Sequence, residues 1–199
     1  MPRTDGWRAY YEAVKNGPPR ATLVKALALF EAHGEQGGFA VDLGCGVGND
    51  AVALLEHGWR VLAVDAEPEA LMFVRERVPN QRAEHLETRI ARFQDFDFPP
   101  ARLVNASLSL PFCDDADFPA VWRRLTASVE RGGRFAGHLF GVRDSWANSG
   151  NGNFHTLEGV QKLLDAFDVE FLDEQEYDGQ TATGTPKHWH VFSIVARRL

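Results

Sequence analysis

Three glycines fall at every second position in the stretch AVDLGCGVGNDAV, residues 40–52, directly after a short apolar run. Glycine loses more chain entropy on ordering than any other residue, so a cluster of glycines needs a reason. The apolar run predicts a buried strand, and the residues after the glycines predict a helix that ends at Gly58. A glycine turn between a strand and a helix brings backbone N–H groups next to a ligand. The sequence therefore predicts a ligand site at residues 44–48.

The spacing of these glycines differs from that of two common phosphate-binding loops. A P-loop has a Lys-Ser/Thr pair after its last glycine, whereas Gly48 is followed by Asn49 and Asp50. The dinucleotide pattern G-x-G-x-x-G requires glycine where this chain has Asn49. Asp42 stands just before the loop, where its negative charge disfavours a pyrophosphate. These residues predict a ligand with a cationic end, such as an amine or a sulfonium.

Two further acidic residues follow apolar runs later in the chain. Asp65 ends the run 59–65, where a carboxylate can accept both hydrogen bonds of a ribose diol. Asp95, in the stretch RFQDF, is expected at the end of a third strand. Its carboxylate would accept the amino group of an adenine, while the N–H of Phe96 contacts a ring nitrogen. Acids at the ends of three strands predict a row of polar anchors along one edge of a sheet.

Runs of strand length alternate with helical segments along the chain. Strands are expected at 37–44, 59–65, 86–96, 101–110 and 132–141, and helices at 7–15, 20–33, 49–58, 67–78, 115–130 and 156–167. Residues 169–198 contain two strand-like runs around a turn-rich segment, which indicates an antiparallel hairpin. We expect one α/β domain over residues 1–199, with a mostly parallel sheet, an antiparallel edge and helices on both faces.

Composition and charge exclude several classes of protein. Hydrophobic residues make up 44% of the chain and charged residues 25%, as in a globular domain rather than a disordered chain. The net charge of −7 repels phosphate backbones and disfavours nucleic-acid partners. No apolar run is long enough to predict a membrane span, and the first 20 residues do not resemble a signal peptide. The two cysteines form no ligand-like cluster, so we expect a cytoplasmic protein.

The stretches VDLGCGVGN, VLAVD and RFQDF together resemble the class I S-adenosylmethionine-dependent methyltransferases over residues 38–142. The resemblance implies a Rossmann-like, seven-stranded sheet and S-adenosylmethionine as the cofactor. It implies that the glycine loop holds the methionine and ribose parts, that Asp42 lies near the amino group, and that Asp65 and Asp95 bind ribose and adenine. Carried over by position, the cofactor-binding residues are Asp42, Gly44, Cys45, Gly46, Gly48, Asn49, Asp65, Ala66, Asp95, Phe96, Asn105, Ala106 and Ser107. The chain departs from the family at the fourth strand, which begins with Ala101 and Arg102 rather than an acid.

Within that class, the size of the chain and its N-terminal segment WRAYYEAVKNGPPRATL are similar to tellurite-resistance-type and thiopurine-type enzymes. This second resemblance implies a small-molecule acceptor and no nucleic-acid or membrane partner; the sequence carries no signal for oligomeric state. It implies that Tyr10, Tyr11 or Arg20 covers the methionine end, with Arg20 as the candidate for its carboxylate. We expect a helical cap at 1–35, a cofactor-binding core at 38–142, and a loop, helix and hairpin on the substrate side at 143–199.

The residues that would act on the acceptor are less clearly marked. His138, Asp114 and His155 are the candidates for a general base, and for each of them a role as a surface or helix-capping residue is favoured over catalysis. In the loop after the fifth strand, Arg143 and Trp146 are candidates for clamping an anionic or flat substrate. The alternative, equally favoured, is that Trp146 anchors the loop and that Arg143 pairs with Asp144.

His188 and His190 lie two apart and would face one side of a strand, but no third ligand has a recognisable spacing, so we expect no metal.

Two other interpretations of the sequence stay open beside methyl transfer. A cofactor-binding module that has lost catalysis would show the same glycine loop. An NAD-dependent oxidoreductase is disfavoured by Asn49 and Asp42.

Overall fold

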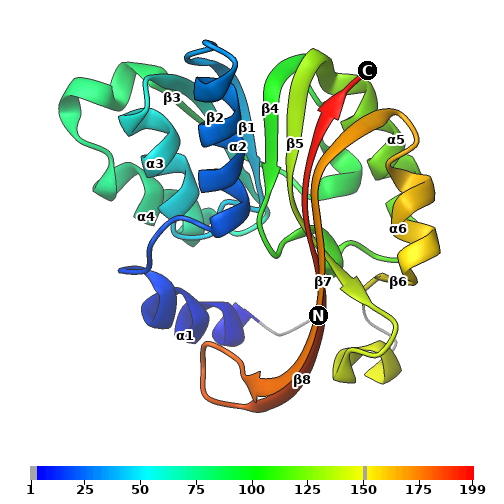
Figure 1. Cartoon of the computed structure of the whole chain (residues 1–199). Coiled ribbons are helices and arrows are strands. Elements are labelled where there is room, and N and C mark those ends of the chain that lie inside the picture. The colour runs from blue at the N-terminus through cyan, green and yellow to red at the C-terminus, as the bar shows by residue number, and fades with distance from the viewer. Residues whose placement is uncertain (1–3, 150–151) are drawn as a thin grey trace.

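The computed structural model describes residues 4–149 and 152–199, and a single mixed sheet forms its centre (Figure 1). Its strands are β1 (Gly38–Leu43), β2 (Trp59–Asp65), β3 (Leu86–Ile90), β4 (Ala101–Ala106), β5 (Val129–Gly141), β6 (Phe154–His155), β7 (Phe167–Gln180) and β8 (Pro186–Arg198). The order across the sheet is β3-β2-β1-β4-β5-β8-β7, and β6 pairs with the end of β5. Strands β1 to β6 are paired in parallel, whereas β8 is antiparallel to both β5 and β7. The expected parallel sheet with an antiparallel edge is confirmed.

The strand count is eight rather than the expected seven. The additional strand, β6, has only two residues, and it forms because Phe154 and His155 lie beside Phe140 and Gly141 of β5. Two residues carry no alternation of apolar and polar side chains, so the sequence pattern could not reveal this strand.

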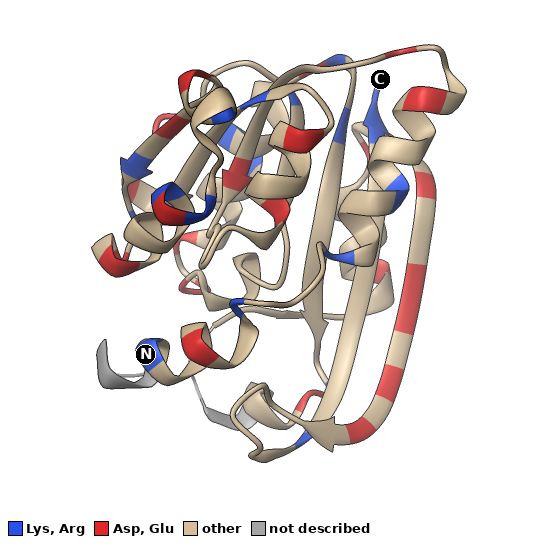
Figure 2. Ribbon diagram, turned by 90° about the vertical axis from the view of Figure 1, so that its left-hand side faces the viewer, with Lys and Arg blue, Asp and Glu red and all other residues tan. Residues whose placement is uncertain are grey.

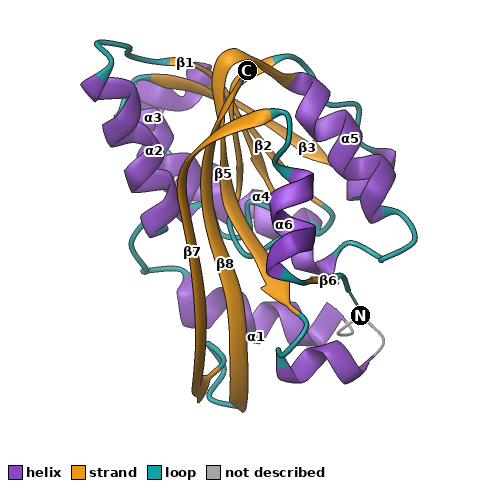
Figure 3. Cartoon of the chain, turned by 45° about the vertical axis from the view of Figure 1, so that its right-hand side comes forward, coloured by secondary structure: helices purple, strands orange, loops and turns teal. Residues whose placement is uncertain are grey.

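Helices cover both faces of the sheet, as expected (Figure 3). They are α1 (Thr4–Val14), α2 (Ala21–Ala32), α3 (Asn49–Glu56), α4 (Pro68–Arg77), α5 (Phe118–Ser128) and α6 (Leu157–Leu163). Buried side chains of α2, α3 and α4 form one core cluster, and those of α5 and α6 belong to the cluster on the other face. Helix α1 lies below the carboxyl ends of the parallel strands, near the tip of the β7–β8 hairpin (Figure 1). Across 4–149 and 152–199, no helix has both the length and the apolar character that a membrane span requires.

The third strand ends earlier than the sequence predicted. Strand β3 stops at Ile90, and Phe93–Asp95 form a short 3₁₀ turn beyond it. Strand β3 is an edge strand, and its only neighbour, β2, ends where Asp65 pairs with Ile90. Beyond Ile90 there is no strand left to pair with, so the chain turns away. The expectation that Asp95 ends this strand is therefore wrong.

Strand β7 forms the open edge of the sheet, and acidic residues repeat along it (Figure 2). Glu174, Glu176 and Asp178 alternate with other residues and so share one side of the strand. Charges along an edge strand hinder its pairing with another chain, because a pairing strand would bring them out of water.

A bulge in β7 supports a buried ion pair. Val169 pairs with Ala196 and Phe171 with Val195, so β7 advances by two residues where β8 advances by one, and Glu170 is the extra residue. Its carboxylate meets the fully buried guanidinium of Arg134 on β5, with Oε2 2.6 Å from Nε and Oε1 2.8 Å from Nη2. Bulges redirect side chains in this way. The pair joins two strands that are not hydrogen-bonded neighbours.

We predict that Glu170→Gln lowers the free energy of unfolding by about 3 kcal/mol, because it leaves the buried Arg134 charge with only the more distant Glu35 carboxylate, whose Oε2 lies 3.9 Å from Nη1. The control is Glu158→Gln, which breaks an exposed pair with Lys162 on α6 and should cost less than about 0.5 kcal/mol. Urea unfolding followed by circular dichroism measures both variants. An equal loss of unfolding free energy in Glu170→Gln and Glu158→Gln would contradict the prediction.

Candidate functional site

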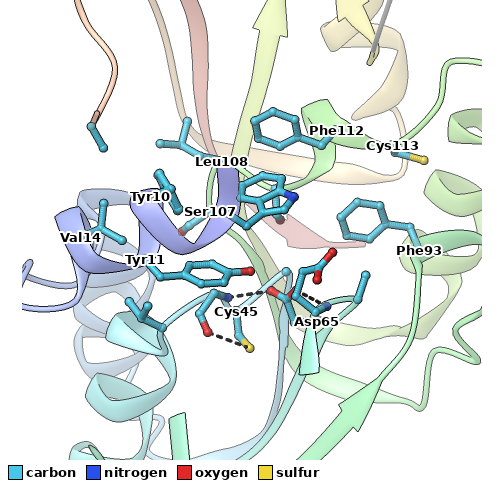
Figure 4. A pocket seen from close by; sticks show the side chains of 18 of the residues that line it. Tyr10, Tyr11, Val14, Cys45, Asp65, Phe93, Ser107, Leu108, Phe112 and Cys113 are labelled. Atoms are coloured by element: carbon cyan, nitrogen blue, oxygen red, sulfur yellow. Dashed lines mark hydrogen bonds between the residues drawn. The ribbon is translucent and has the colours of Figure 1, made fainter. Parts of the chain in front are cut away.

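A pocket of about 460 Å³ opens at the carboxyl ends of the parallel strands (Figure 4). Its walls come from α1, from the segments that follow β1, β2, β3 and β4, from the end of β5 with the loop behind it, and from the tip of the β7–β8 hairpin. Tyr10, Tyr11 and Val14 of α1 approach the pocket from the side opposite Asp65 and Cys45 (Figure 4). The pocket thus lies between the sheet and a helical cover.

The glycine loop leads from β1 into α3 and is hydrogen-bonded to the end of β2. The N–H groups of Gly44 and Cys45 both donate to the Val64 carbonyl, at 2.8 and 3.0 Å. Gly44 has a φ of +69°, and a Cβ there would lie 2.3 Å from the Cβ of Ser109. Gly48 has a φ of +80°, and a Cβ there would lie 2.8 Å from a methyl group of Val74. Both glycines are required by close packing and by left-handed backbone, which other residues rarely adopt.

Asp65 at the end of β2 is held by the backbone. Its Oδ2 accepts a hydrogen bond from the Gly46 N–H, and its Oδ1 accepts one from the Glu67 N–H, each at 2.9 Å. Burial raises the pKa of this carboxyl, and the two N–H donors oppose that shift. Each oxygen keeps acceptor capacity after these two bonds. The carboxylate lines the pocket and is fixed in position before any ligand arrives.

A second carboxylate, Asp42 on β1, is buried at the inner end of the pocket. Its Oδ1 accepts from the Asn105 amide at 2.8 Å, and the same amide nitrogen donates to Asp50 at 2.9 Å. The Asp42 Oδ2 atom has no partner within the described chain. Burial, followed by the charge of Asp50, raises the pKa of Asp42 to about 8. A buried acceptor without a donor is matched to a ligand that brings its own N–H groups.

Asn49 and Arg20 attach the N-terminal segment to this part of the site. Asn49 donates to the Val14 carbonyl at 2.9 Å and accepts from Arg77 at 2.6 Å. The Arg20 N–H donates to Asp50 at 2.8 Å, and the Arg20 side chain lines the pocket. Asn49, where a dinucleotide loop has glycine, therefore anchors the end of α1.

The outer part of the pocket is lined by aromatic rings from four separate segments. We call this set the aromatic wall: Trp7, Phe112, Phe140, Trp146 and Trp189. The ring of Trp146 lies 5.9–6.0 Å, between centroids, from the rings of Phe112, Phe140 and Trp189. Trp7 meets Phe112 edge-on at 5.4 Å. Offset and edge-on rings at these distances form a stable, mostly apolar surface.

A buried ion pair supports the aromatic wall. The Lys187 ammonium pairs with Asp144 and lies 3.8 Å from the ring centre of Trp146 and 4.4 Å from that of Trp189. Asp144 also accepts from the backbone N–H groups of Trp146, at 3.0 Å, and His190, at 3.2 Å. Burial lowers the pKa of Lys187, and its bond to Asp144 opposes that shift. One carboxylate therefore ties the loop after β5 to β8 and orients two rings of the wall.

The pocket brings together many of the residues that the sequence predicted. From the predicted cofactor set, it is lined by Tyr11, Arg20, Asp42, Gly44, Cys45, Gly46, Asn49, Asp65, Ala66 and Ser107. Five others do not line it. Gly48 packs on α4, Ala106 and Phe96 lie in the core, and Asn105 is buried between two carboxylates. Asp95 is exposed and pairs with Arg92 at 2.8 Å, while its neighbours Phe93 and Gln94 line the pocket.

Of the three candidate bases, Asp114 lines the pocket and the two histidines do not. His138 is buried on the side of β5 that faces α2, where burial lowers its pKa to about 4. His155 is hydrogen-bonded to the Asn153 side chain at 2.8 Å and contacts the ring of Phe118.

Of the two candidate substrate residues, Trp146 lines the pocket and Arg143 does not. The Arg143 guanidinium pairs with Glu174 at 3.0 Å and Glu176 at 2.7 Å, rather than with the adjacent acid. His188 and His190 pair with acids of β7, and the described ranges hold no cluster of three metal-binding side chains.

The sequence analysis missed most of the aromatic wall. Trp189 lies in the stretch KHWH, between the two histidines that drew attention as metal ligands. The strand alternation that puts the histidines on one side puts Lys187 and Trp189 on the other, so this pair could have been found. Phe112 and Trp7 carry no such signal, since a turn and a separate helix bring them to the pocket.

Comparisons with known proteins agree with this arrangement. Residues 40–133 match the family model described as a methyltransferase domain. Over 68 residues, the chain is 35% identical to a probable cobalt-precorrin-6B C(15)-methyltransferase (decarboxylating) of Pyrobaculum calidifontis. That match covers 33% of this chain and 35% of the relative, so the chain spans about a third of it.

Solved structures are similar over nearly the whole chain. TehB from Haemophilus influenzae superposes with a TM-score of 0.75 at 12% identity. The match covers 96% of this chain and 66% of the TehB chain, so this chain spans slightly less than two thirds of TehB. The N-methyltransferase NodS from Bradyrhizobium japonicum, solved with S-adenosyl-L-homocysteine, gives 0.71 at 14% identity, covering 98% of this chain and 97% of its own. A 1,6-didemethyltoxoflavin-N1-methyltransferase from Burkholderia thailandensis, solved with that compound and S-adenosylhomocysteine, gives 0.67 at 21% identity, covering 98% and 85%.

The chain therefore has the fold of the class I methyltransferases. Residues 40–133 match the methyltransferase-domain model, and the glycine loop lies at the start of that match. The resemblance stated from the sequence is confirmed at the level of domain and fold.

We predict that Asp42 makes the folded protein less stable as the pH rises. Its folded pKa of about 8 lies above the ordinary aspartate pKa of 3.8, so the folded state binds this proton more tightly than the unfolded chain does. The stability gained below pH 4 is lost progressively as the pH rises through 8. Urea unfolding from pH 4 to pH 8.5 should show the wild type losing stability relative to Asp42→Asn. A pH-independent difference between the two would contradict this.

Proposed function

We propose that this protein transfers a methyl group from S-adenosylmethionine to a small, flat aromatic acceptor. One observation carries the proposal: the unpartnered Asp42 carboxyl oxygen and the Asp65 carboxylate line the same pocket as the aromatic wall. The inner part presents acceptors for a ligand with N–H and O–H groups. The outer part presents ring faces and edges for an apolar, planar molecule.

The residues of the inner part fit S-adenosylmethionine. Asp42 has a free oxygen for its ammonium group, Arg20 can meet its carboxylate, and Asp65 can accept from both ribose hydroxyls. Gly44 and Gly46 leave the backbone bare beside it. For the adenine end we propose Phe93 and Gln94, which line the pocket, in place of Asp95. When bound, the cofactor supplies an electrophilic methyl group on a sulfonium.

The chain contributes position and the exclusion of water. The aromatic wall and the cover formed by α1 hold the acceptor in a desolvated space, which suits an in-line displacement. The lone pair of the acceptor forms the new bond to the methyl carbon as the bond from that carbon to sulfur breaks. Of the predicted bases only Asp114 reaches the pocket, and no predicted histidine does. This favours acceptors that react without a base, such as a thiolate or a ring nitrogen with a free lone pair.

The comparisons support a small acceptor. The Burkholderia neighbour holds 1,6-didemethyltoxoflavin together with S-adenosylhomocysteine. In this chain, the hairpin tip adds threonines around the outer pocket, namely Thr181, Thr183 and Thr185. Threonine hydroxyls can bond to polar groups at the rim of a flat molecule.

The direct test is a screen of candidate acceptors for S-adenosylhomocysteine production. Heteroaromatic thiols and amines are expected to be methylated, and tellurite, selenite and aliphatic amines serve as comparison compounds. Turnover with aliphatic acceptors alone would reject the aromatic acceptor. Cofactor binding without turnover on any compound would indicate the catalytically silent module instead.

We predict that Asp65→Ala weakens S-adenosylhomocysteine binding by about a hundredfold, since two hydrogen bonds to a charged group are lost. Gly46→Val should have at least the same effect, because its side chain would enter the pocket beside Tyr11. The matched control is Asp97→Ala, which removes an exposed carboxylate outside the pocket. Calorimetric titration measures the affinities, and circular dichroism checks the fold. Wild-type affinity in both site variants would overturn the cofactor assignment.

We predict that Trp189→Ala raises KM for the acceptor about tenfold, because one face of the aromatic wall is removed. The Trp189 ring belongs to β8 and to the aromatic wall, not to the glycine loop. The affinity for S-adenosylhomocysteine should therefore stay within a factor of about two. Steady-state kinetics together with calorimetry separate the two effects. A loss of cofactor affinity that equals the change in KM would argue against a separate acceptor end.

A further inference from the structure

A second cavity, of about 750 Å³, lies between the first half of α2 and the strands β5, β7 and β8. Arg20, Thr22 and Lys25 line it from the helix side, and His138 and Ser193 line it from two neighbouring strands. His138 and Ser193 are directly paired in the β5–β8 register. No residue predicted to bind the cofactor, other than Arg20, lines this cavity.

Two buried polar atoms that line this cavity have no partner. The side chain of His138 is part of a residue that is only 8% exposed, and its Nδ1 atom makes no hydrogen bond. Thr22 is 2% exposed, and its hydroxyl also makes none. A buried polar group without a partner costs about 1–3 kcal/mol. Two such groups from different elements, facing one cavity, indicate that a polar ligand completes their bonds.

The charges around the cavity favour an anion. Arg20 makes no ion pair with the residues that the structure places, and the Lys25 ammonium lies over the Phe171 ring at 4.5 Å. Asp173 is the one acid that lines the cavity. Helix α2 has 12 residues, begins here, and has no side-chain cap at Arg20. The uncapped N–H groups and the dipole of the helix add further positive potential.

We propose that this cavity is a second binding site, for a small molecule with a carboxylate or phosphate group. The oxyanion would accept hydrogen bonds from the Thr22 hydroxyl and the Ser193 hydroxyl, and Arg20, whose guanidinium the proposed function assigns to the cofactor carboxylate, would contribute its positive charge. His138 would supply a further donor once it binds a proton. This site goes beyond the proposed methyl transfer, because it lies on the α2 side of the sheet and holds no part of the acceptor.

Protonation of His138 gives the site a direct readout. Burial and the charge of Arg20 lower the pKa of His138 to about 4 in the free protein. An anion beside the ring neutralises that field and stabilises the imidazolium, so the pKa rises on binding. Two other charged groups line the cavity, Lys25 and Asp173. The Lys25 charge opposes the rise in the His138 pKa, and Asp173 lies there both with and without the anion, so it does not change the difference.

The test is a titration of the whole chain with inorganic phosphate, followed by NMR of the His138 ring, with acetate as a second arm for carboxylates. Sodium chloride at matched ionic strength is the control. We expect a saturable shift, with the pKa of His138 raised by at least one unit in phosphate or acetate but not in chloride. Absence of a saturable shift with both anions, or the same shift with chloride, would overturn the site.

A matched pair of variants tests the contact directly. Thr22→Val removes a hydroxyl from the cavity and should weaken anion binding at least fivefold. Thr126→Val removes another unpartnered hydroxyl, on α5 at the other face of the sheet, and should leave it unchanged. Equal affinities for the anion in Thr22→Val and Thr126→Val would show that the Thr22 hydroxyl does not bind it. S-adenosylhomocysteine binding, measured on the same samples, keeps a failure of this site distinct from a failure of the proposed function.

Discussion

The site depends on how β1 and β2 end side by side. Two N–H groups of the glycine loop converge on the Val64 carbonyl, and the next residue of β2, Asp65, turns back to accept from Gly46. This arrangement needs a left-handed backbone and the absence of a side chain where Ser109 approaches Gly44. Because the same few bonds fix both the loop and the carboxylate, the cofactor end is built by the fold itself rather than by flexible side chains.

Buried polar groups are concentrated at the inner end of the pocket. Asp42 and Asp50 share the amide of Asn105, which can donate to both but cannot neutralise either. The raised pKa of Asp42 follows from this crowding. The protein thus holds a carboxyl that is costly to ionise when it is alone. An arriving ammonium group would remove that cost, which gives the pocket a preference for cations that burial of apolar surface alone could not give.

The cofactor end was predictable from sequence because it is local. Residues 42–49 form one turn, and Asp65 ends a run of strand length, so spacing alone placed them together. Asp95 failed as a strand end because β3 loses its pairing partner, which no pattern within RFQDF encodes. His138 looked like a site residue since it ends an apolar run, but strand alternation turned it toward α2. The aromatic wall gathers residues 7, 112, 140, 146 and 189, and only the tertiary structure unites them.

The pocket is assembled from two parts of the chain with little in common. The β7–β8 hairpin and the loop that Asp144 ties to it supply Trp146, Trp189 and the threonines at the tip, and none of these belongs to the methyltransferase domain match at 40–133. Substitutions at the hairpin tip therefore change the outer wall without disturbing the backbone bonds of the glycine loop. The C-terminal hairpin therefore shapes the outer pocket independently of the segment that holds the glycine loop.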